Sequence, residues 1–330
     1  MKELLRKLVS AYGPSGNEGP VREIIKEEIQ DFVDNIQVDA LGNLIAIKKG
    51  EGTRVMVAAH MDQIGFIVTH IDEKGFLRFS NVGGISVQNS FHSKVRLNNG
   101  VRGVIGYETD VDDIKKIKLD RMFIDIGASS REEAEKLVSI GDMAVYDSPL
   151  AESNGRYFSG AMDDRVGCAV QIETIKRLPK TENEIYFVFT VQEEVGTRGA
   201  KTAAFALDPE VGFALDVTLT GDTPKAKTMA VKLGDGPAIK VKDASVLAHP
   251  KVKELMVKTA KENGIPYQME VLVAGGTDSG PIHLTRSGVP SGVLSIPCRY
   301  VHSDNEMVDA NDVENAVRLM VKILEKRIVL

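Results

Sequence analysis

Histidine and acidic side chains recur in this sequence just beyond short apolar runs, where they could bind metal ions. In an open α/β sheet, ligands bind beyond the carboxyl ends of the strands, so such positions are candidates for an active site that the fold assembles in one cleft. They are His60 and Asp62 after Val55–Ala59, Glu193 and Glu194 after Ile185–Val191, Asp216 after Val211–Leu215, His302 beyond Val293–Pro297, and Asp163 and Asp164 at the start of an expected helix.

These residue types favour metal-dependent hydrolysis. Imidazole and carboxylate ligands without thiolate suit Zn²⁺, Co²⁺ or Mn²⁺, and two such ions that share a carboxylate form a hydrolytic site. In His60-x-Asp62, the aspartate can accept the second ring N–H and fix the tautomer. At a strand end the adjacent carboxylates of Glu193 and Glu194 point in different directions, so one can bind metal while the other deprotonates the metal-bound water. Each pair alone is a weak signal, but their conjunction indicates a catalytic site.

The remaining polar and sulfur-containing residues have simpler interpretations. Cys168 and Cys298 lie far apart with no CxxC spacing, which excludes a thiolate zinc site and a disulfide framework and favours a reducing compartment. We expect both to be small buried side chains. Arg299 is expected to pair with a carboxylate that the sequence does not identify. Surface or structural roles are expected for the other four histidines, His70, His92, His249 and His283.

Composition describes a globular chain of one or two domains. Its 330 residues are 43% hydrophobic and 27% charged, with a formal net charge of −6. This charge lacks the basic footprint of a nucleic-acid-binding protein. No run approaches the roughly 18 apolar residues of a membrane span, and the N-terminus lacks the apolar core and cleavage site of a signal peptide. We therefore expect a cytoplasmic protein with neither nucleic-acid nor membrane partners.

The elements that must position these residues alternate between buried strands and amphipathic helices. This pattern predicts an α/β fold whose mixed, largely parallel sheet is sandwiched by helices. Besides the strands that precede the site residues, we predict a hairpin around Gly42–Asn43. Helices are expected at 3–10, 19–33, 164–177, 198–206, 250–263 and 311–327.

Residues 67–156 have a different texture, with short β-like runs separated by turn signals such as Asn98–Asn99–Gly100. One helix is expected there, from Glu132 to Ser139, because Ser130 and Glu133 have capping-box spacing. We therefore predict a discontinuous catalytic α/β domain, residues 1–66 and 157–330, interrupted by a small β-rich domain at 67–156.

Several runs of sequence carry a resemblance to a known family. They are GPSGNE at 13–18, LGNLIA at 41–46, AHMDQIGF at 59–66, MDDRVG at 162–167, VQEEVG at 191–196, GGTD at 275–278 and PCRYVHS at 297–303. Together they resemble the M42 metalloaminopeptidases, a family of glutamyl and tetrahedral aminopeptidases with members labelled endoglucanase or cellulase M. One departure is Gln63, where the family commonly has Glu, but this is not a ligand position.

The resemblance implies a dinuclear metal-dependent aminopeptidase that hydrolyses N-terminal residues from peptides. Two divalent ions, Zn²⁺, Co²⁺ or Mn²⁺, would share Asp163 as a bridging ligand. His60 and Asp216 would complete the coordination at one or other metal, and Glu194 and His302 would do likewise.

The resemblance also assigns the catalytic residues and an assembly. Glu193 would be the general base that activates the metal-bridging water, and Asp62 would be the hydrogen-bonding partner of His60. A cis peptide is implied between Asp163 and Asp164, and Thr277–Asp278 would shape the substrate pocket. The inserted domain would be a dimerisation module, with dimers assembling into a hollow tetrahedral dodecamer.

Three alternatives are weaker on the residues. M20-type deacylases and peptidases carry their extra domain between the fourth and fifth ligand positions, whereas the long insertion here lies between Asp62 and Asp163. A glycoside hydrolase could use two carboxylates, but aromatic residues are only 5% of the chain, tryptophan is absent, and His60 and His302 would have no role. A non-catalytic scaffold is disfavoured because a competent ligand occupies every candidate metal position.

Overall fold

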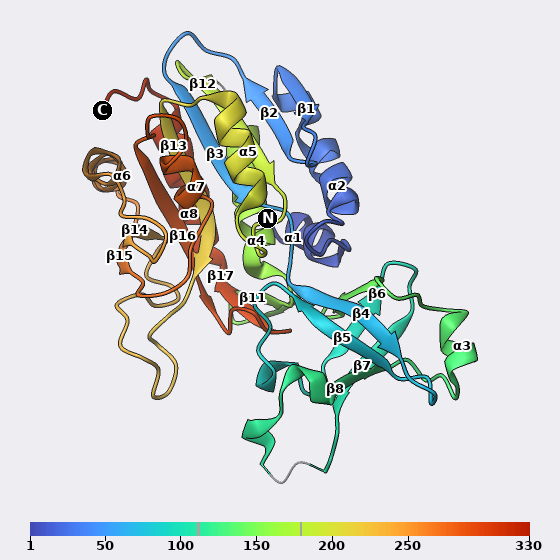
Figure 1. Ribbon diagram of the computed structural model, residues 1–330. Helices are drawn as coiled ribbons and strands as arrows, with labels where there is room; N and C mark the ends of the chain where they lie inside the picture. The colour runs from blue at the N-terminus through green and yellow to red at the C-terminus, as the bar shows by residue number, and fades with distance from the viewer. Residues whose placement is uncertain (111–112, 179) are drawn as a thin grey trace.

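The protein combines a large mixed sheet with a closed β-barrel, as the computed structural model in Figure 1 shows for residues 1–110, 113–178 and 180–330. The sheet follows the order β1-β2-β12-β3-β13-β16-β17-β11-β10, with β14 on β16 and β15 on β14. Its strands are β1 (Asn35–Val38), β2 (Leu44–Lys48), β3 (Arg54–His60), β10 (Ala151–Ser153), β11 (Arg156–Ser159), β12 (Glu184–Thr190), β13 (Val211–Thr218), β14 (Ala238–Lys242), β15 (Gln268–Val271), β16 (Ser291–Arg299) and β17 (Glu306–Asp309).

The predicted parallel character holds only for the centre of this sheet. Strands β12, β3, β13 and β16 run parallel to one another. On either side of them, β2 pairs antiparallel with β12, and β14 and β17 pair antiparallel with β16. For β17 the reason is local, because a short turn after β16 reverses the chain. The sheet is therefore mixed rather than largely parallel.

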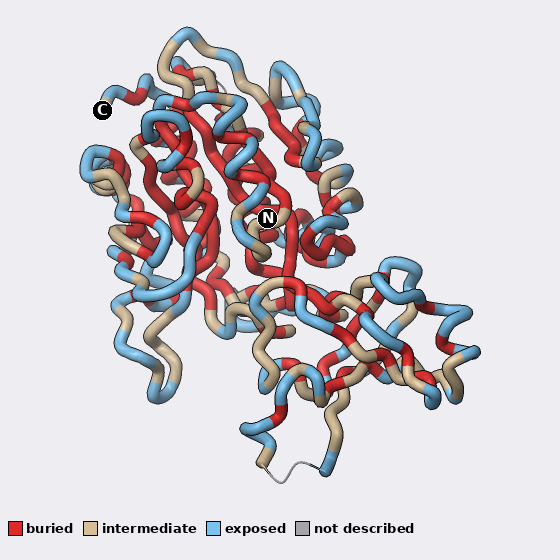
Figure 2. Tube along the Cα trace, in the orientation of Figure 1, coloured by how far each residue is buried: buried red, intermediate tan, exposed pale blue. Residues whose placement is uncertain are grey.

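Helices cover both faces of the sheet, as the alternation of elements predicted (Figure 1). Along β3, Val55, Val57 and Ala59 pack toward one layer of helices, while Met56 and Ala58 pack toward the other. Figure 2 shows the buried central strands between the two layers. The first layer contains α1 (Lys2–Ser10), α2 (Gly19–Ile29), α4 (Met162–Arg177), α6 (Pro250–Glu262) and α8 (Ala310–Leu324), and the second α5 (Arg198–Leu207) and α7 (Ser279–His283).

The barrel closes in the order β4-β5-β8-β7-β6-β9 around its own apolar core, which includes Phe66, Leu77, Val95 and Ile124. Its elements are β4 (Gly65–Ile71), β5 (Leu77–Val82), β6 (Lys94–Leu97), β7 (Arg102–Tyr107), β8 (Met122–Asp125), β9 (Met143–Tyr146) and α3 (Arg131–Glu135), with short 3₁₀ turns at Gln88–Ser90, Ile114–Lys116 and Leu119–Arg121. A further 3₁₀ turn, Gln30–Phe32, follows α2 in the other part of the chain. The predicted β-rich segment thus forms a barrel. The predicted domain boundaries, between residues 66 and 67 and between residues 156 and 157, stay predictions.

Two elements differ from expectation in a way that matters. Strand β13 continues through Asp216 to Thr218, because its pairing with β16 persists beyond the apolar run. Asp216 therefore lies within a strand, not after one. Helix α3 ends at Glu135, earlier than predicted, because the chain tightens there: the N–H of Leu137 donates to the carbonyl of Ala134, three residues back rather than four.

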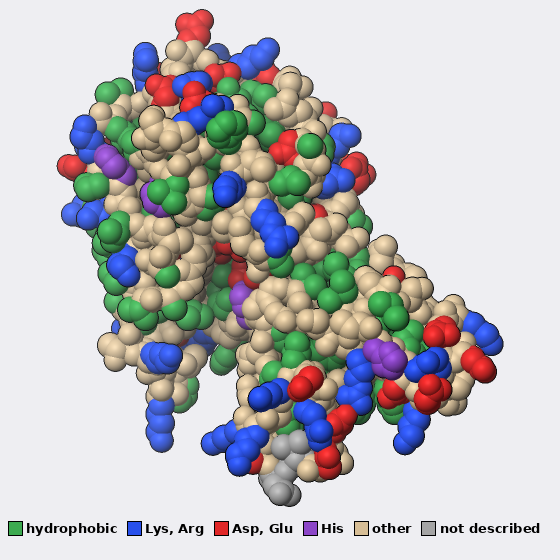
Figure 3. Space-filling model, in the orientation of Figure 1, with side chains coloured by type: hydrophobic (Ala, Val, Ile, Leu, Met, Phe, Trp, Pro, Cys, Tyr) green, Lys and Arg blue, Asp and Glu red, His purple; other side chains and the backbone are tan. Residues whose placement is uncertain are grey.

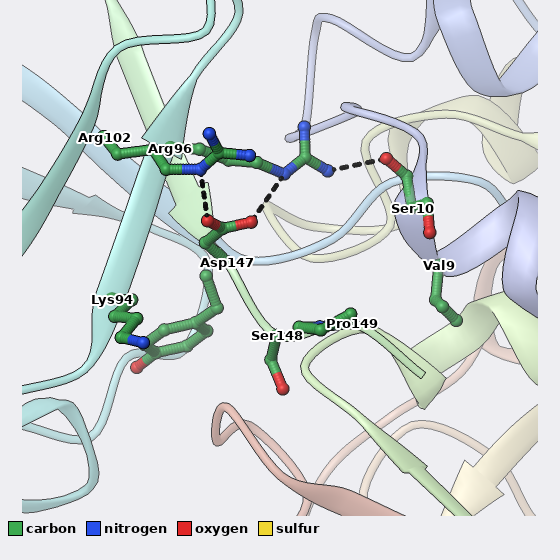
Figure 4. A pocket seen from close by; sticks show the side chains of 9 residues that line it. Val9, Ser10, Lys94, Arg96, Arg102, Asp147, Ser148 and Pro149 are labelled. Atoms are coloured by element: carbon green, nitrogen blue, oxygen red, sulfur yellow. Dashed lines mark hydrogen bonds and ion pairs between the residues drawn. The ribbon is translucent and has the colours of Figure 1, made fainter. Parts of the chain in front are cut away.

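A cavity of about 490 Å³ lies where the barrel meets α1 (Figure 4). Arg96 and Arg102 both approach Asp147 there, with Nε to carboxylate distances of 3.6 and 2.8 Å, and Arg96 also donates to the carbonyl of Ser10. The described residues that line this cavity do not include any of the predicted site residues. These contacts fasten the barrel to the first helix.

Candidate active site

The structure brings all five predicted metal ligands together at the carboxyl ends of the central strands. They form two groups that share Asp163, and within each group the donor atoms lie within 4.8 Å of one another. Figure 3 shows histidine and acidic side chains at the base of a recess above the barrel. The groups are His60, Asp163 and Asp216, and Asp163, Glu194 and His302.

The two oxygens of Asp163 face different histidines. Oδ1 lies 3.0 Å from Nε2 of His60, and Oδ2 lies 3.3 Å from Nε2 of His302. The same His302 nitrogen lies 3.2 Å from Oε2 of Glu194. The other oxygen of Glu194 is buried and has no hydrogen-bond partner among the residues that the structure describes. Because each oxygen of the shared carboxylate faces its own group, and all donors are imidazole or carboxylate, the residues fit two divalent ions.

Burial and mutual repulsion dominate the electrostatics of this cluster. Burial raises the pKa of Asp216 well above its usual value, and the nearby carboxylate of Asp163 raises it further. Burial likewise raises the pKa of Glu193. The nearby His60 acts to lower this pKa, whereas the carboxylate of Asp216 raises it further. Burial also acts on Asp163, but hydrogen bonds with His302 and His60 outweigh it and lower the pKa of this carboxyl. Such crowding of carboxylates is compensated when cations bind among them.

Glu193 lies beside the ligand groups rather than in them. Its Oε2 is 3.9 Å from Nε2 of His60, and its side chain is 12% exposed. The preceding residue, Gln192, has a left-handed backbone with φ of 56° and donates its N–H to the buried carboxylate of Glu18. A carboxylate beside the ligands but free of them can act as a base.

Asp62 organises the turn that carries Glu193 and Glu194. Its Oδ1 accepts the Glu193 N–H at 2.9 Å, and its Oδ2 accepts the Glu194 N–H at 3.2 Å and the Ser15 hydroxyl at 2.6 Å. Nδ1 of His60 lies 3.1 Å from the Asp62 carbonyl and 3.5 Å from its carboxylate. The partnership with His60 stays a prediction, whereas the hold on the glutamate turn was not foreseen.

The barrel reaches the site through two adjacent glycines. A Cβ on Gly84 would lie 2.7 Å from Nδ1 of His302, and one on Gly83 would lie 3.1 Å from Cβ of Glu194. Gly83 also has a φ of 77°. Neither contact has a signal in the local sequence, since both depend on how the barrel docks against the main sheet.

Several smaller expectations have clear outcomes. The Asp163–Asp164 peptide is cis, and Asp164 accepts the backbone N–H of His60. Cys168 and Cys298 are buried and free. The carboxylate that pairs with Arg299 is Asp222, at 2.6 and 3.0 Å. The histidines at 70, 92, 249 and 283 lie outside both ligand groups of the described residues.

The region of Thr277–Asp278 contributes a buried acid and part of a groove. Asp278 accepts the hydroxyl of Thr190, and burial raises its pKa to about 6. Thr277 lines a cavity of about 840 Å³ between α5 and α7, which begins at Thr197, where the backbone N–H donates to the carbonyl of Glu193. The cavity continues past Lys201, Phe205, Pro281, Leu284 and Arg286.

Residues that the sequence did not single out support the site from outside. Ser15, Glu18 and Glu306 are each no more than 5% exposed. Ser15 and Glu306 hydrogen-bond to Asp62 and His302, and Glu18 accepts the N–H of Gln192, the residue before Glu193. Ser15 and Glu18 lie in the GPSGNE run, which was a weak signal, while Glu306 follows His302 by four positions without any motif. In the described part of the chain, no helix is long and apolar enough to cross a membrane.

Comparison with known proteins gives consistent matches along the chain. A family model described as M42 glutamyl aminopeptidase matches residues 42–319. A putative aminopeptidase of Acetivibrio thermocellus is 56% identical over 324 residues, 98% of each chain.

Solved structures of aminopeptidases match equally widely. An aminopeptidase from the archaeon Desulfurococcus kamchatkensis has a TM-score of 0.95 at 42% identity, over 98% of this chain and 94% of that one. The TET1 peptidase of Pyrococcus horikoshii, described as assembling into a tetrahedron or a large octahedral shell, has a TM-score of 0.88 at 37% identity over 98% of both chains.

Proposed function

Since this chain belongs to the M42 family and is therefore a peptidase, we propose that it is a two-metal aminopeptidase that removes N-terminal residues from peptides. The observation that carries the proposal is the pair of donor groups sharing Asp163, with Glu193 beside them and outside them. A shared carboxylate between two ligand sets, with a free carboxylate adjacent, is an arrangement that suits two-metal hydrolysis with a separate base.

We infer that His60, Asp163 and Asp216 hold one divalent ion, and that Asp163, Glu194 and His302 hold the other. Zn²⁺, Co²⁺ and Mn²⁺ suit these donors. When bound, the ions supply Lewis-acid polarisation of the scissile carbonyl and acidify the attacking water.

Glu193 performs the proton transfers in this proposal. Its carboxylate takes a proton from the attacking water and returns it to the amine that leaves when the peptide C–N bond breaks. Asp62 holds the main chain of Glu193 and Glu194, so that one carboxylate is aimed at the reaction and the other at the metal. The groove from Thr197 to Arg286 is available to receive part of the substrate.

The alternatives find no support in this geometry. The barrel strands lie between Asp62 and Asp163, whereas the M20 arrangement has its extra domain between later ligands. A glycoside hydrolase would leave His60 and His302 without a role. Release of reducing sugar from carboxymethylcellulose by chelator-treated protein would revive that activity.

The proposed assembly is a homo-oligomer, with the barrel as the dimerisation module and a dodecamer as the end state. The Pyrococcus horikoshii relative that assembles into closed shells supports it. Light scattering after size exclusion, with and without added metal, tests it, and a monomer under metal-replete conditions would contradict it. A cytoplasmic location and the lack of nucleic-acid and membrane partners stay predictions.

The activity is tested with a panel of aminoacyl-p-nitroanilides after chelation and reloading with Zn²⁺, Co²⁺ or Mn²⁺. We expect hydrolysis of free-amino substrates and none of their N-acetylated counterparts. Glu193→Gln is the matched inactive control. A wild-type protein that binds two ions but cleaves no aminoacyl substrate would overturn the proposal.

A further inference from the structure

Glu306, the first residue of β17, is a buried acid with an unusual pair of partners. The residue is 1% exposed, and the ion pairs of the described residues include none to its carboxylate. Oε2 accepts the backbone N–H of Asp163 at 2.9 Å, and Oε1 accepts the backbone N–H of His302 at 2.7 Å. One side chain therefore ties together the main chains of two proposed metal ligands.

These two ligands belong to segments that would otherwise be held separately. Asp163 is the second residue of α4, whereas His302 lies in the turn between β16 and β17. His302 and Tyr300 both have left-handed backbones, with φ of 61° and 60°, which non-glycine residues adopt only when their surroundings enforce it. The His302 side chain is also 32% exposed, so packing alone leaves it loosely held.

We propose that Glu306 is a positioning residue that keeps Asp163 and His302 at the spacing required for metal binding. This inference rests on the proposed two-metal function. The inference predicts unequal effects on the two donor groups, because Asp163 belongs to both groups while His302 belongs to only one. Loss of Glu306 loosens two of three donors in the His302 group but only one of three in the His60 group.

A buried acid could instead serve general stability, and the chain offers a matched control. Asp312 is 0% exposed, and its two oxygens accept the backbone N–H groups of Gly234 and Gly236 at 2.7 and 2.8 Å. It has the same chemistry and burial as Glu306, but its partners are not proposed ligands. Glu306→Gln and Asp312→Asn each replace one accepting oxygen by an NH₂ group.

The experiment is calorimetric titration of Zn²⁺ into chelator-treated wild type, Glu306→Gln and Asp312→Asn. We expect two ions per wild-type chain, and in Glu306→Gln one of the two weakened roughly 10- to 100-fold, the range for removing a partner that orients a ligand. Asp312→Asn should bind both ions as the wild type does. Excess Zn²⁺ should restore the kcat of Glu306→Gln, since no group that touches substrate has changed.

The outcomes separate this inference from the function on which it rests. A wild type that binds fewer than two ions would contradict the two-metal function. If the wild type binds two ions and Glu306→Gln binds them with the same affinities as Asp312→Asn, the role of Glu306 is overturned while the two-metal function stands. If Glu306→Gln fails to fold, Glu306→Asp keeps the charge but withdraws the carboxylate by one methylene, and unchanged metal affinity in that variant would equally overturn the inference.

Discussion

Replacing Asp62 by Asn tests whether the Glu193–Glu194 turn depends on a carboxylate. Asp62 is 0% exposed, and its two oxygens accept three hydrogen bonds, from the N–H groups of Glu193 and Glu194 and from the hydroxyl of Ser15. An asparagine has one accepting oxygen. Whichever way the amide is oriented, its NH₂ group opposes at least one backbone donor of the glutamate turn.

The size of the effect follows from that lost acceptor. A hydrogen bond to a charged group contributes about 1.5–3 kcal/mol. At 1.36 kcal/mol for each factor of ten, a loss of this size expressed fully in the transition state lowers kcat/KM roughly 10- to 150-fold. The oxygens of Asp62 are in neither donor group, but one of them holds the main chain of the proposed ligand Glu194, so kcat/KM is measured with metal ions in excess to keep both sites filled.

The assay compares kcat/KM on the best aminoacyl-p-nitroanilide with the metal content of the same sample. Ser15→Ala is the control, because it removes one partner of Asp62 and leaves both backbone bonds of the turn intact, so its loss should be smaller. A kcat/KM for Asp62→Asn within twofold of wild type would refute the reasoning. An equally large loss in Ser15→Ala would also refute it, since the backbone bonds would then not be what matters.

The other predictions concern the base, the barrel contact and the metals. Glu193→Gln should keep both ions, measured by elemental analysis, and lose roughly 10²–10⁴-fold in kcat; near-normal turnover would exclude Glu193 as the base. Gly84→Ala should displace His302 and weaken one metal site, and titration of that variant with unchanged affinities would be the contrary result. Chelation should lower the thermal midpoint, since ions at 1,000 times their Kd stabilise by about 4 kcal/mol. In metal-free protein the folded-state pKa values of His60, Asp216 and Glu193 are raised above their unfolded-state values, which are about 6.5 for His and about 4 for the two acids. Between each unfolded-state value and the corresponding raised value, the folded state therefore binds more protons than the unfolded state. Its stability should therefore fall as the pH rises toward those raised values, and a midpoint that increases from pH 6 to 8 would contradict this.

Much of the site could be predicted because its signals are local. Apolar runs that end at His60 and at Glu193–Glu194 mark strand ends, and strand ends in an α/β sheet converge on one edge. Asp216 lies in the cluster, as expected, but the strand was predicted to stop before it, and this was wrong because β13 runs through it. The sequence shows where the apolar run stops, whereas the strand continues as long as its neighbour β16 offers hydrogen bonds.

The supporting contacts could not be predicted, because each joins segments far apart in the chain. Ser15 reaches Asp62, Glu306 reaches Asp163, and Gly84 lies against His302 only after the barrel and the loops have docked. A carboxylate that accepts two backbone N–H groups has no sequence pattern of its own. Glu306 and Asp312 are both buried acids of this kind, and nothing in their local sequence distinguishes the one beside the ligands.

The sequence by itself determined the family, the alternation of strands and helices, and the residue types that could bind metal. Periodicity and strand-end chemistry are written along the chain, within a few residues of each other. The tertiary structure alone decided the mixed sheet order, the pairing of donors around Asp163, and the backbone contacts that hold Glu193 and His302 in place. These depend on which distant loops meet, and that choice is made by packing of the whole core rather than by any local pattern.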